Sequence, residues 1–112
     1  MRFVSVLLVL WTLSSSLAAC AGPLCQGESQ FDNGQYPLAK ETFAALEAQS
    51  REWASSRQAR YALFRGLTHA ALGDRTKAGV WLREAKAIED AHPASLSPID
   101  VRRLKLGLDA LD

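Results

Sequence analysis

The apolar positions divide the chain into two unlike parts. Residues 3–13 form an apolar run interrupted only by Ser5 and Thr12, with Arg2 before it and serines and small residues after it. A charged start, an apolar run too short to cross a membrane and a small-residue ending are typical of an export signal. Beyond residue 24 the apolar residues instead recur at every third or fourth position, which predicts amphipathic helices.

Five helices are predicted from this periodicity, at about residues 25–32, 36–49, 57–72, 75–91 and 98–111. The helix at 57–72 is apolar on most sides, which is typical of a helix in the middle of a bundle. Asn33-Gly34, Gly73-Asp74 and His92-Pro93 are expected to end helices, and Ser97 to cap the last one. No segment alternates apolar and polar residues as a half-buried strand would, so we predict an all-α fold.

Charge narrows the classes of partner. Without residues 1–19 the chain has 93 residues and carries 12 basic and 12 acidic side chains. A neutral chain has no electrostatic reason to bind nucleic acid, and it offers no polybasic patch to anionic lipid. We therefore expect residues 1–19 to be a signal peptide, 20–24 a tether and 25–112 one small helical domain.

The end of the apolar segment, Leu17-Ala18-Ala19-Cys20, resembles the lipobox of bacterial lipoproteins. The resemblance implies that Cys20 is alkylated with diacylglycerol, becomes the new N-terminus and anchors the chain through acyl groups such as palmitate. Ala21 follows Cys20, where an Asp would imply retention at the inner membrane, so we expect the outer membrane, facing the periplasm. The alternatives are an ordinary secretory signal cleaved between Ala19 and Gly22, and an uncleaved N-terminal anchor.

Cys25 is the second of two cysteines. With Cys20 lipidated it is expected to be a lone thiol that packs as a small apolar side chain at the start of the first helix. The alternative is a small C-x4-C disulfide loop in an exported chain.

Two segments repeat with a period of 39 residues, inside the range of helical-hairpin repeats. Each has a turn glycine, a small residue five positions later, a large apolar residue four after that and another apolar residue three further on, as in Gly34, Ala39, Phe43, Leu46 and in Gly73, Ala78, Leu82, Ala85. The pattern resembles the tetratricopeptide repeat, with Gly66 at the small position of the first helix. The resemblance implies a helical-hairpin array of about two repeats, with the helix from Pro98 as a C-terminal cap. The departures are Ala62 in place of the favoured Trp, His69 in place of Tyr, and a late Pro93.

The first helices of tetratricopeptide arrays line a concave groove. The resemblance therefore implies a partner-binding strip at Arg60, Leu63, Leu67 and Ala70. We expect Leu63 and Leu67 to lie on an open surface that suits an extended peptide or an amphipathic helix. Arg57, Arg60 and Arg65 form either a solvated face paired with Glu52 and Glu47 or a docking site for a carboxylate.

No phosphate-binding glycine loop, metal-ligand cluster or nucleophile elbow is found in the sequence, so we predict no cofactor, no metal and no enzymatic activity. The function expected from these features is that of a membrane-anchored envelope lipoprotein acting as a protein-binding adaptor or assembly factor, with self-association as a further source of stability. The alternatives are a pilotin-like lipoprotein that escorts a secretion-channel subunit, an envelope enzyme or enzyme subunit, and a structural component of a larger assembly.

Overall fold

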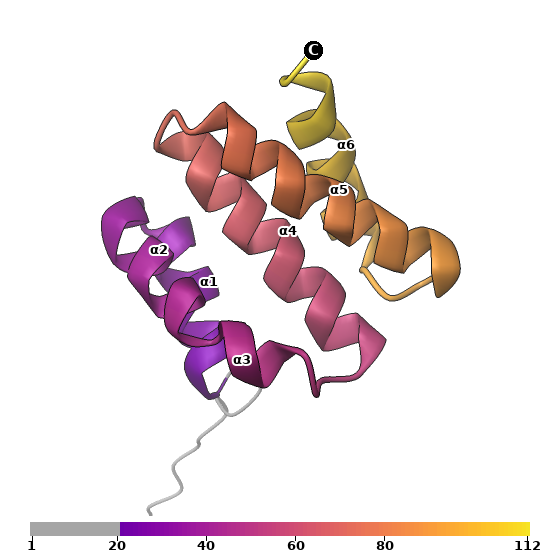
Figure 1. Cartoon of the computed structure of the whole chain (residues 1–112), viewed down its shortest axis with the longest axis horizontal. Helices are drawn as coiled ribbons and strands as arrows, with labels where there is room; N and C mark the ends of the chain where they lie inside the picture. Colours follow the sequence, from indigo (N-terminus) through magenta and orange to yellow (C-terminus); the bar gives the residue numbers. More distant parts are fainter. Residues whose placement is uncertain (1–20) are drawn as a thin grey trace, which may run out of the picture.

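The computed structural model describes residues 21–112, and all of the regular structure in this part of the chain is helical, which confirms the all-α helical array (Figure 1). The helices are α1 (Pro23–Asp32), α2 (Tyr36–Ala45), α3 (Glu47–Ser50), α4 (Ser55–Ala71), α5 (Arg75–Ala91) and α6 (Pro98–Asp109). The expectations for the signal peptide and for Cys20 fall on residues 1–20 and lie outside the described residues.

Two antiparallel hairpins, α1–α2 and α4–α5, are closed by turns of the same geometry (Figure 1). Gly34 and Gly73, 39 positions apart, have φ angles of 77° and 84°, a region that a residue with a side chain rarely adopts. In the first turn the amide of Gln35 donates to the carbonyl of Gln30 at 2.8 Å. In the second turn the amide of Asp74 donates to that of His69 at 2.9 Å.

In each hairpin a glycine of the first helix also packs against a large apolar side chain of the second helix. A Cβ atom added to Gly27 would lie 2.4 Å from the Phe43 ring, and one added to Gly66 would lie 2.8 Å from the Leu82 side chain. These two pairs are 39 positions apart in the sequence as well. The expectation that Gly66 lets two helices approach closely is confirmed, and the structure adds Gly27 as its counterpart in the first hairpin.

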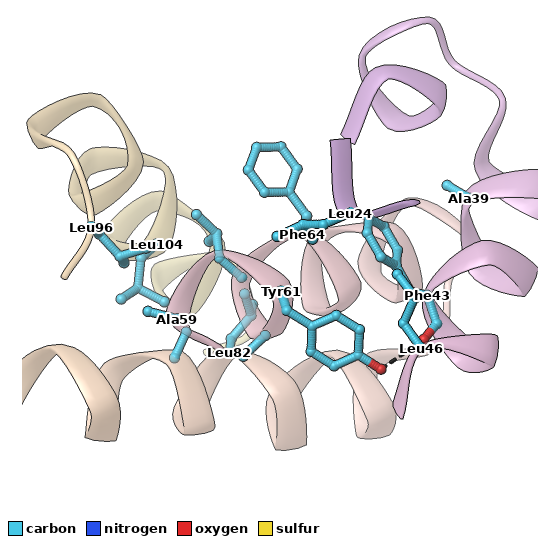
Figure 2. Close-up of a cluster of buried hydrophobic side chains, with 13 residues drawn as sticks. Leu24, Ala39, Phe43, Leu46, Ala59, Tyr61, Phe64, Leu82, Leu96 and Leu104 are labelled. Atoms are coloured by element: carbon cyan, nitrogen blue, oxygen red, sulfur yellow. Dashed lines mark hydrogen bonds between the residues drawn. The ribbon is translucent and has the colours of Figure 1, made fainter. Parts of the chain in front are cut away.

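Helix α4 is the centre of the molecule, because every other described helix contacts it. Its buried residues meet side chains from both hairpins and from α6 in one cluster (Figure 2). Tyr61 is 2 % exposed, and its hydroxyl donates to the carbonyl of Phe43 at 2.7 Å, so this buried polar group is satisfied.

The single helix expected at 36–49 is broken at Leu46, between α2 and α3. The carbonyl of Phe43 accepts from the Tyr61 hydroxyl and from the amide of Leu46, three residues ahead. A tightened turn of this kind ends regular α-helix, and it places Leu46 in the core at 4 % exposure.

Helix α6 packs across the second hairpin. The side chain of Ser97 accepts from the amide of Asp100 at 3.2 Å, which confirms Ser97 as its N-cap. A Cβ atom added to Gly107 would lie 3.1 Å from both Leu67 and Leu82, so α6 lies directly on α4 and α5.

The first helix begins earlier than expected. It starts at Pro23, and Leu24 is 2 % exposed within the core, so part of the predicted tether at 20–24 belongs to the folded domain. Cys25 is buried on α1 and is disulfide-bonded, so the expectation of a lone thiol was wrong.

The close contact between Gly66 and Leu82 predicts opposite effects of two alanine substitutions on the stability of the α4–α5 hairpin. Gly66→Ala should destabilise the protein by about 1–3 kcal/mol, because the added methyl group meets the Leu82 side chain at 2.8 Å and its backbone nitrogen at 3.0 Å. Gly79→Ala is the control, because its methyl group meets only the mobile end of Arg83 and alanine favours helix. Urea unfolding of both variants measures the difference. Equal stability of the Gly66 variant and the unsubstituted protein would contradict the close crossing.

Candidate functional site

The predicted partner-binding strip does not form one open groove. Arg60 donates from Nε and Nη2 to the two carboxylate oxygens of Glu28 on α1, at 3.0 and 2.9 Å. Leu63 is 0 % exposed and Leu67 is half-buried, while Ala70 is exposed. The expectation that Leu63 lies on an open surface is therefore wrong, and Leu67 is only partly exposed.

The strip is the flank on which the next helix of the array packs. On α1 the residues that lie 39 positions before Leu63 and Ala70 are Leu24 and Phe31. Leu24 is buried, and the Phe31 ring meets the Phe64 ring of α4 edge to face at 5.6 Å between centroids. On α4 the corresponding flank receives α6, with Leu67 against Gly107. At Leu67 the surface of α4 that we expected to be open is therefore covered by α6.

The three arginines of α4 do not converge on a site for a carboxylate ligand. Arg60 pairs with Glu28, Arg65 pairs with Glu47 at 3.0 Å, and Arg57 lies 4.2 Å from the centre of the Trp53 ring. The pairing of Arg65 with Glu47 was expected, and that of Arg60 with Glu28 was missed. Each guanidinium is already engaged by the chain itself, which removes the main reason to expect an anionic ligand there.

Arg65 joins three helices in a buried cluster. Its side chain is 12 % exposed, donates to the Tyr61 hydroxyl at 2.7 Å and lies 4.4 Å from the centre of the Trp81 ring on α5. Burial raises the pKa of Tyr61 and the nearby Arg65 charge opposes that rise, so the phenol stays protonated and able to donate at neutral pH. Nε of Arg65 is buried without a hydrogen-bond partner among the described residues.

His69 is buried next to this cluster at 3 % exposure. Burial, followed by repulsion from Arg65, lowers its pKa below the usual value of 6.5. The imidazole is therefore neutral at neutral pH. Its position 39 residues after the buried Gln30 assigns it a structural role at the hairpin turn.

Three clefts lie between the helices in the described part of the chain, and the largest, of about 480 Å³, is a shallow one between the start of α4 and the end of α5. Of the other two, one, of about 280 Å³, lies between α3 and α5, and its floor includes Tyr61 and Ala62 of α4. Among the described helices, α5 contacts neither α2 nor α3. The other, of about 440 Å³, lies between α5 and α6. Leucines line its floor and charged side chains its rim, its lining residues being Lys86, Glu89, Asp90, Val101, Leu104, Lys105, Leu108 and Asp109. Both are open troughs rather than enclosed pockets, and they suit a macromolecular partner better than a small ligand.

Exposed apolar side chains gather on α6. Of the six large apolar side chains that are exposed in the described part of the chain, three belong to this helix: Ile99 at 67 %, Val101 at 40 % and Leu106 at 63 %. The resemblance to tetratricopeptide arrays, whose first helices line a groove, had placed the binding strip on α4 instead.

Comparison of the chain with protein-family models, with curated proteins and with solved structures found no match. Among residues 21–112 no group of three or more histidine, cysteine or acidic side chains is placed to hold a metal ion. In the same part of the chain, no helix is both long enough and apolar enough to span a bilayer.

The covered strip predicts a sharp contrast between Leu63 and Leu106. Leu63→Gln should cost about 3–5 kcal/mol, because it removes a fully buried side chain and buries an amide. Leu106→Gln should change the unfolding free energy by less than about 0.5 kcal/mol, because this side chain is exposed. Chemical denaturation of the two variants and of the unsubstituted protein measures the three unfolding free energies. A stable Leu63 variant would restore the open groove.

The lowered pKa of His69 predicts loss of stability in mild acid. As pH falls below about 6.5 the unfolded chain binds a proton at His69 before the folded chain does, so the free energy of unfolding decreases towards the lower pKa of the folded state. His69→Gln should flatten this dependence between pH 7.5 and pH 5.5, since Gln30 already occupies the equivalent position. His92→Gln is the control for removal of a histidine, because His92 is exposed and lies outside this cluster. Parallel slopes for all three proteins would exclude His69 as the cause.

Proposed function

We propose that the chain is a lipid-anchored adaptor of the bacterial envelope, which binds another envelope protein through its helical array and carries out no catalysis. The observation that carries the proposal is the exposed apolar surface of α6, which holds three of the six large apolar side chains exposed in the described part of the chain. Apolar side chains gathered on one element of a small domain mark a surface for interaction.

The hairpin geometry supports an interaction array. The two hairpins are 39 residues apart in the sequence, and in each of them a glycine lets the two helices approach closely. These two features support the proposed tetratricopeptide-like array. In such arrays each unit contacts only its neighbours, so the outer surfaces of the helices remain open to a partner.

The anchor rests on the Leu17-Ala18-Ala19-Cys20 ending. A disulfide between Cys20 and Cys25, the alternative that the sequence leaves open, would use the same sulfur atom as a thioether-linked lipid, so the two exclude each other. With both a diacylglycerol and an N-terminal acyl chain the membrane binding is stable, whereas a single chain binds only marginally.

Mass spectrometry of the protein isolated from membranes tests the anchor. We expect an N-terminal peptide that begins at an acylated Cys20, and a Cys20→Ser variant that stays unprocessed and loses acylation. An N-terminus at Ala21 or Gly22, or a peptide pair joined by a Cys20–Cys25 disulfide, would contradict lipidation. Crosslinking in intact membranes then tests the adaptor. One defined protein should be recovered with the acylated chain and lost in the Cys20→Ser variant.

A further inference from the structure

The last helix and the loop before it are weakly buried. Of residues 93–112 only Leu96 and Leu104 are buried, whereas α4 buries eight of its seventeen residues. Segments with few buried apolar contacts open locally at a lower free-energy cost than the core of a protein. Residues 93–112 therefore have the burial of a segment that can open separately.

Helix α6 lies on α4 and α5 with a close contact and a gap. A Cβ atom added to Gly107 would lie 3.1 Å from Leu67 and from Leu82, so the backbone of α6 approaches both helices there. The open cleft of about 440 Å³ between α5 and α6 has Leu104 and Leu108 in its lining. The apolar packing of α6 along α5 is therefore incomplete.

A carboxylate of α5 holds the loop that leads into α6. The Glu89 side chain accepts from the amide of Ala94 at 2.9 Å and from the amide of Leu96 at 2.8 Å. Ala94 has a φ angle of 70°, in the left-handed region that a residue with a Cβ atom rarely adopts. Such a strained conformation persists only while its surroundings hold it, and Glu89 provides two of the hydrogen bonds that do so.

A guanidinium at the other end of α5 holds the end of α6. Arg75 donates to the carbonyl of Ala110 at 3.3 Å and to the carbonyl of Leu111. The last carbonyls of a helix have no partner within the helix, so a cation suits them. Arg75 and Glu89 are fourteen residues apart, which is about 21 Å along α5. Two charged side chains of one helix therefore fasten residues 93–112 near both ends.

We propose that residues 93–112 form a strap, which opens as one unit from α4 and α5 and is fastened by Glu89 and Arg75. Opening uncovers Leu67 and the side of Leu82 that faces α6, a surface whose occupant in the closed state is a helix of this chain. Release of Glu89 also relieves the strain at Ala94, which favours opening. The inference goes beyond the proposed adaptor function and does not depend on the lipid anchor.

Native-state hydrogen exchange of the full chain, resolved by residue, tests the separate opening. The amides of α6 from Val101 to Ala110 should show one common protection factor, because the strap opens as a unit. That factor should be at least about tenfold lower than the protection factors of the amides in the middle of α4.

Four variants on α5 test the fastenings. Arg75→Ala and Glu89→Ala should each lower the protection of α6 at least about fivefold and leave that of α4 unchanged, because each removes a charged partner of the strap. Lys77→Ala and Lys86→Ala are the matched controls. Each removes an exposed lysine near one end of α5, and Lys86 pairs with Asp90 of the same helix. Both controls should exchange as the unsubstituted chain does.

A peptide with the sequence of residues 97–112 tests whether opening uncovers a surface for a helix. Added as a fluorescent probe, it competes with the strap for the same surface, so its apparent affinity depends on the fraction of open chains. The double variant Arg75→Ala, Glu89→Ala should bind the peptide at least about tenfold more tightly than the unsubstituted chain.

The opposite results overturn the inference. They are exchange of α6 and α4 through one common unfolding, variants at Arg75 and Glu89 that affect α4 as much as α6 or behave as the lysine controls do, and equal peptide binding by the double variant and the unsubstituted chain. A chain found without acyl groups would overturn the proposed anchor and leave these measurements unaffected.

Discussion

The close crossing of the two helices in each hairpin is the constraint on which the rest of the structure depends. Gly27 and Gly66 present bare backbone to Phe43 and Leu82, so the helix axes approach until these large side chains fill the space that a methyl group would need. Phe43 and Leu82 are then fully buried, and the positive φ angles at Gly34 and Gly73 reverse the chain at the distance that the crossing sets. A 39-residue unit built in this way exposes one apolar flank, which the next helix must cover.

Helix α4 meets this demand for both hairpins, and it carries polar groups into the interior. Tyr61 donates to a backbone carbonyl that the break between α2 and α3 leaves accessible, and Arg65 is held by Glu47, by the Tyr61 hydroxyl and by the Trp81 ring. A buried charge of this kind is costly unless it is paired, so the cluster specifies how the first hairpin sits against the second more than it adds to stability. His69 stays neutral in the same surroundings because burial lowers its pKa.

The end of the array concentrates the exposed apolar surface. Helix α6 packs on Leu67 and Leu82 at Gly107 and leaves its own Ile99 and Leu106 exposed, so one packing event both extends the core and leaves an apolar surface in solvent. The chemistry that we first assigned to α4, an apolar strip with an arginine at its end, is found on α6 in exposed form. The binding hypothesis therefore moves by one helix along the array, and its physical basis, apolar burial with a guanidinium at the edge, is unchanged.

The helices, their order and the 39-residue hairpin repeat could be predicted from the sequence, because apolar periodicity, turn glycines and the Ser97 cap act over a few neighbouring residues. The close contact of another helix at Gly66 was also predictable, because the resemblance to the tetratricopeptide repeat puts Gly66 at the small position of the first helix. Other features depended on contacts between distant segments. They are the break at Leu46, where the Tyr61 hydroxyl donates to the Phe43 carbonyl, the pairing of Arg60 with Glu28, and the burial of Leu63 in the core. Local pattern shows that a side chain is apolar, but only tertiary packing decides which apolar side chains are covered. For that reason the sequence determined the array, and the structure decided which of its helices remains open.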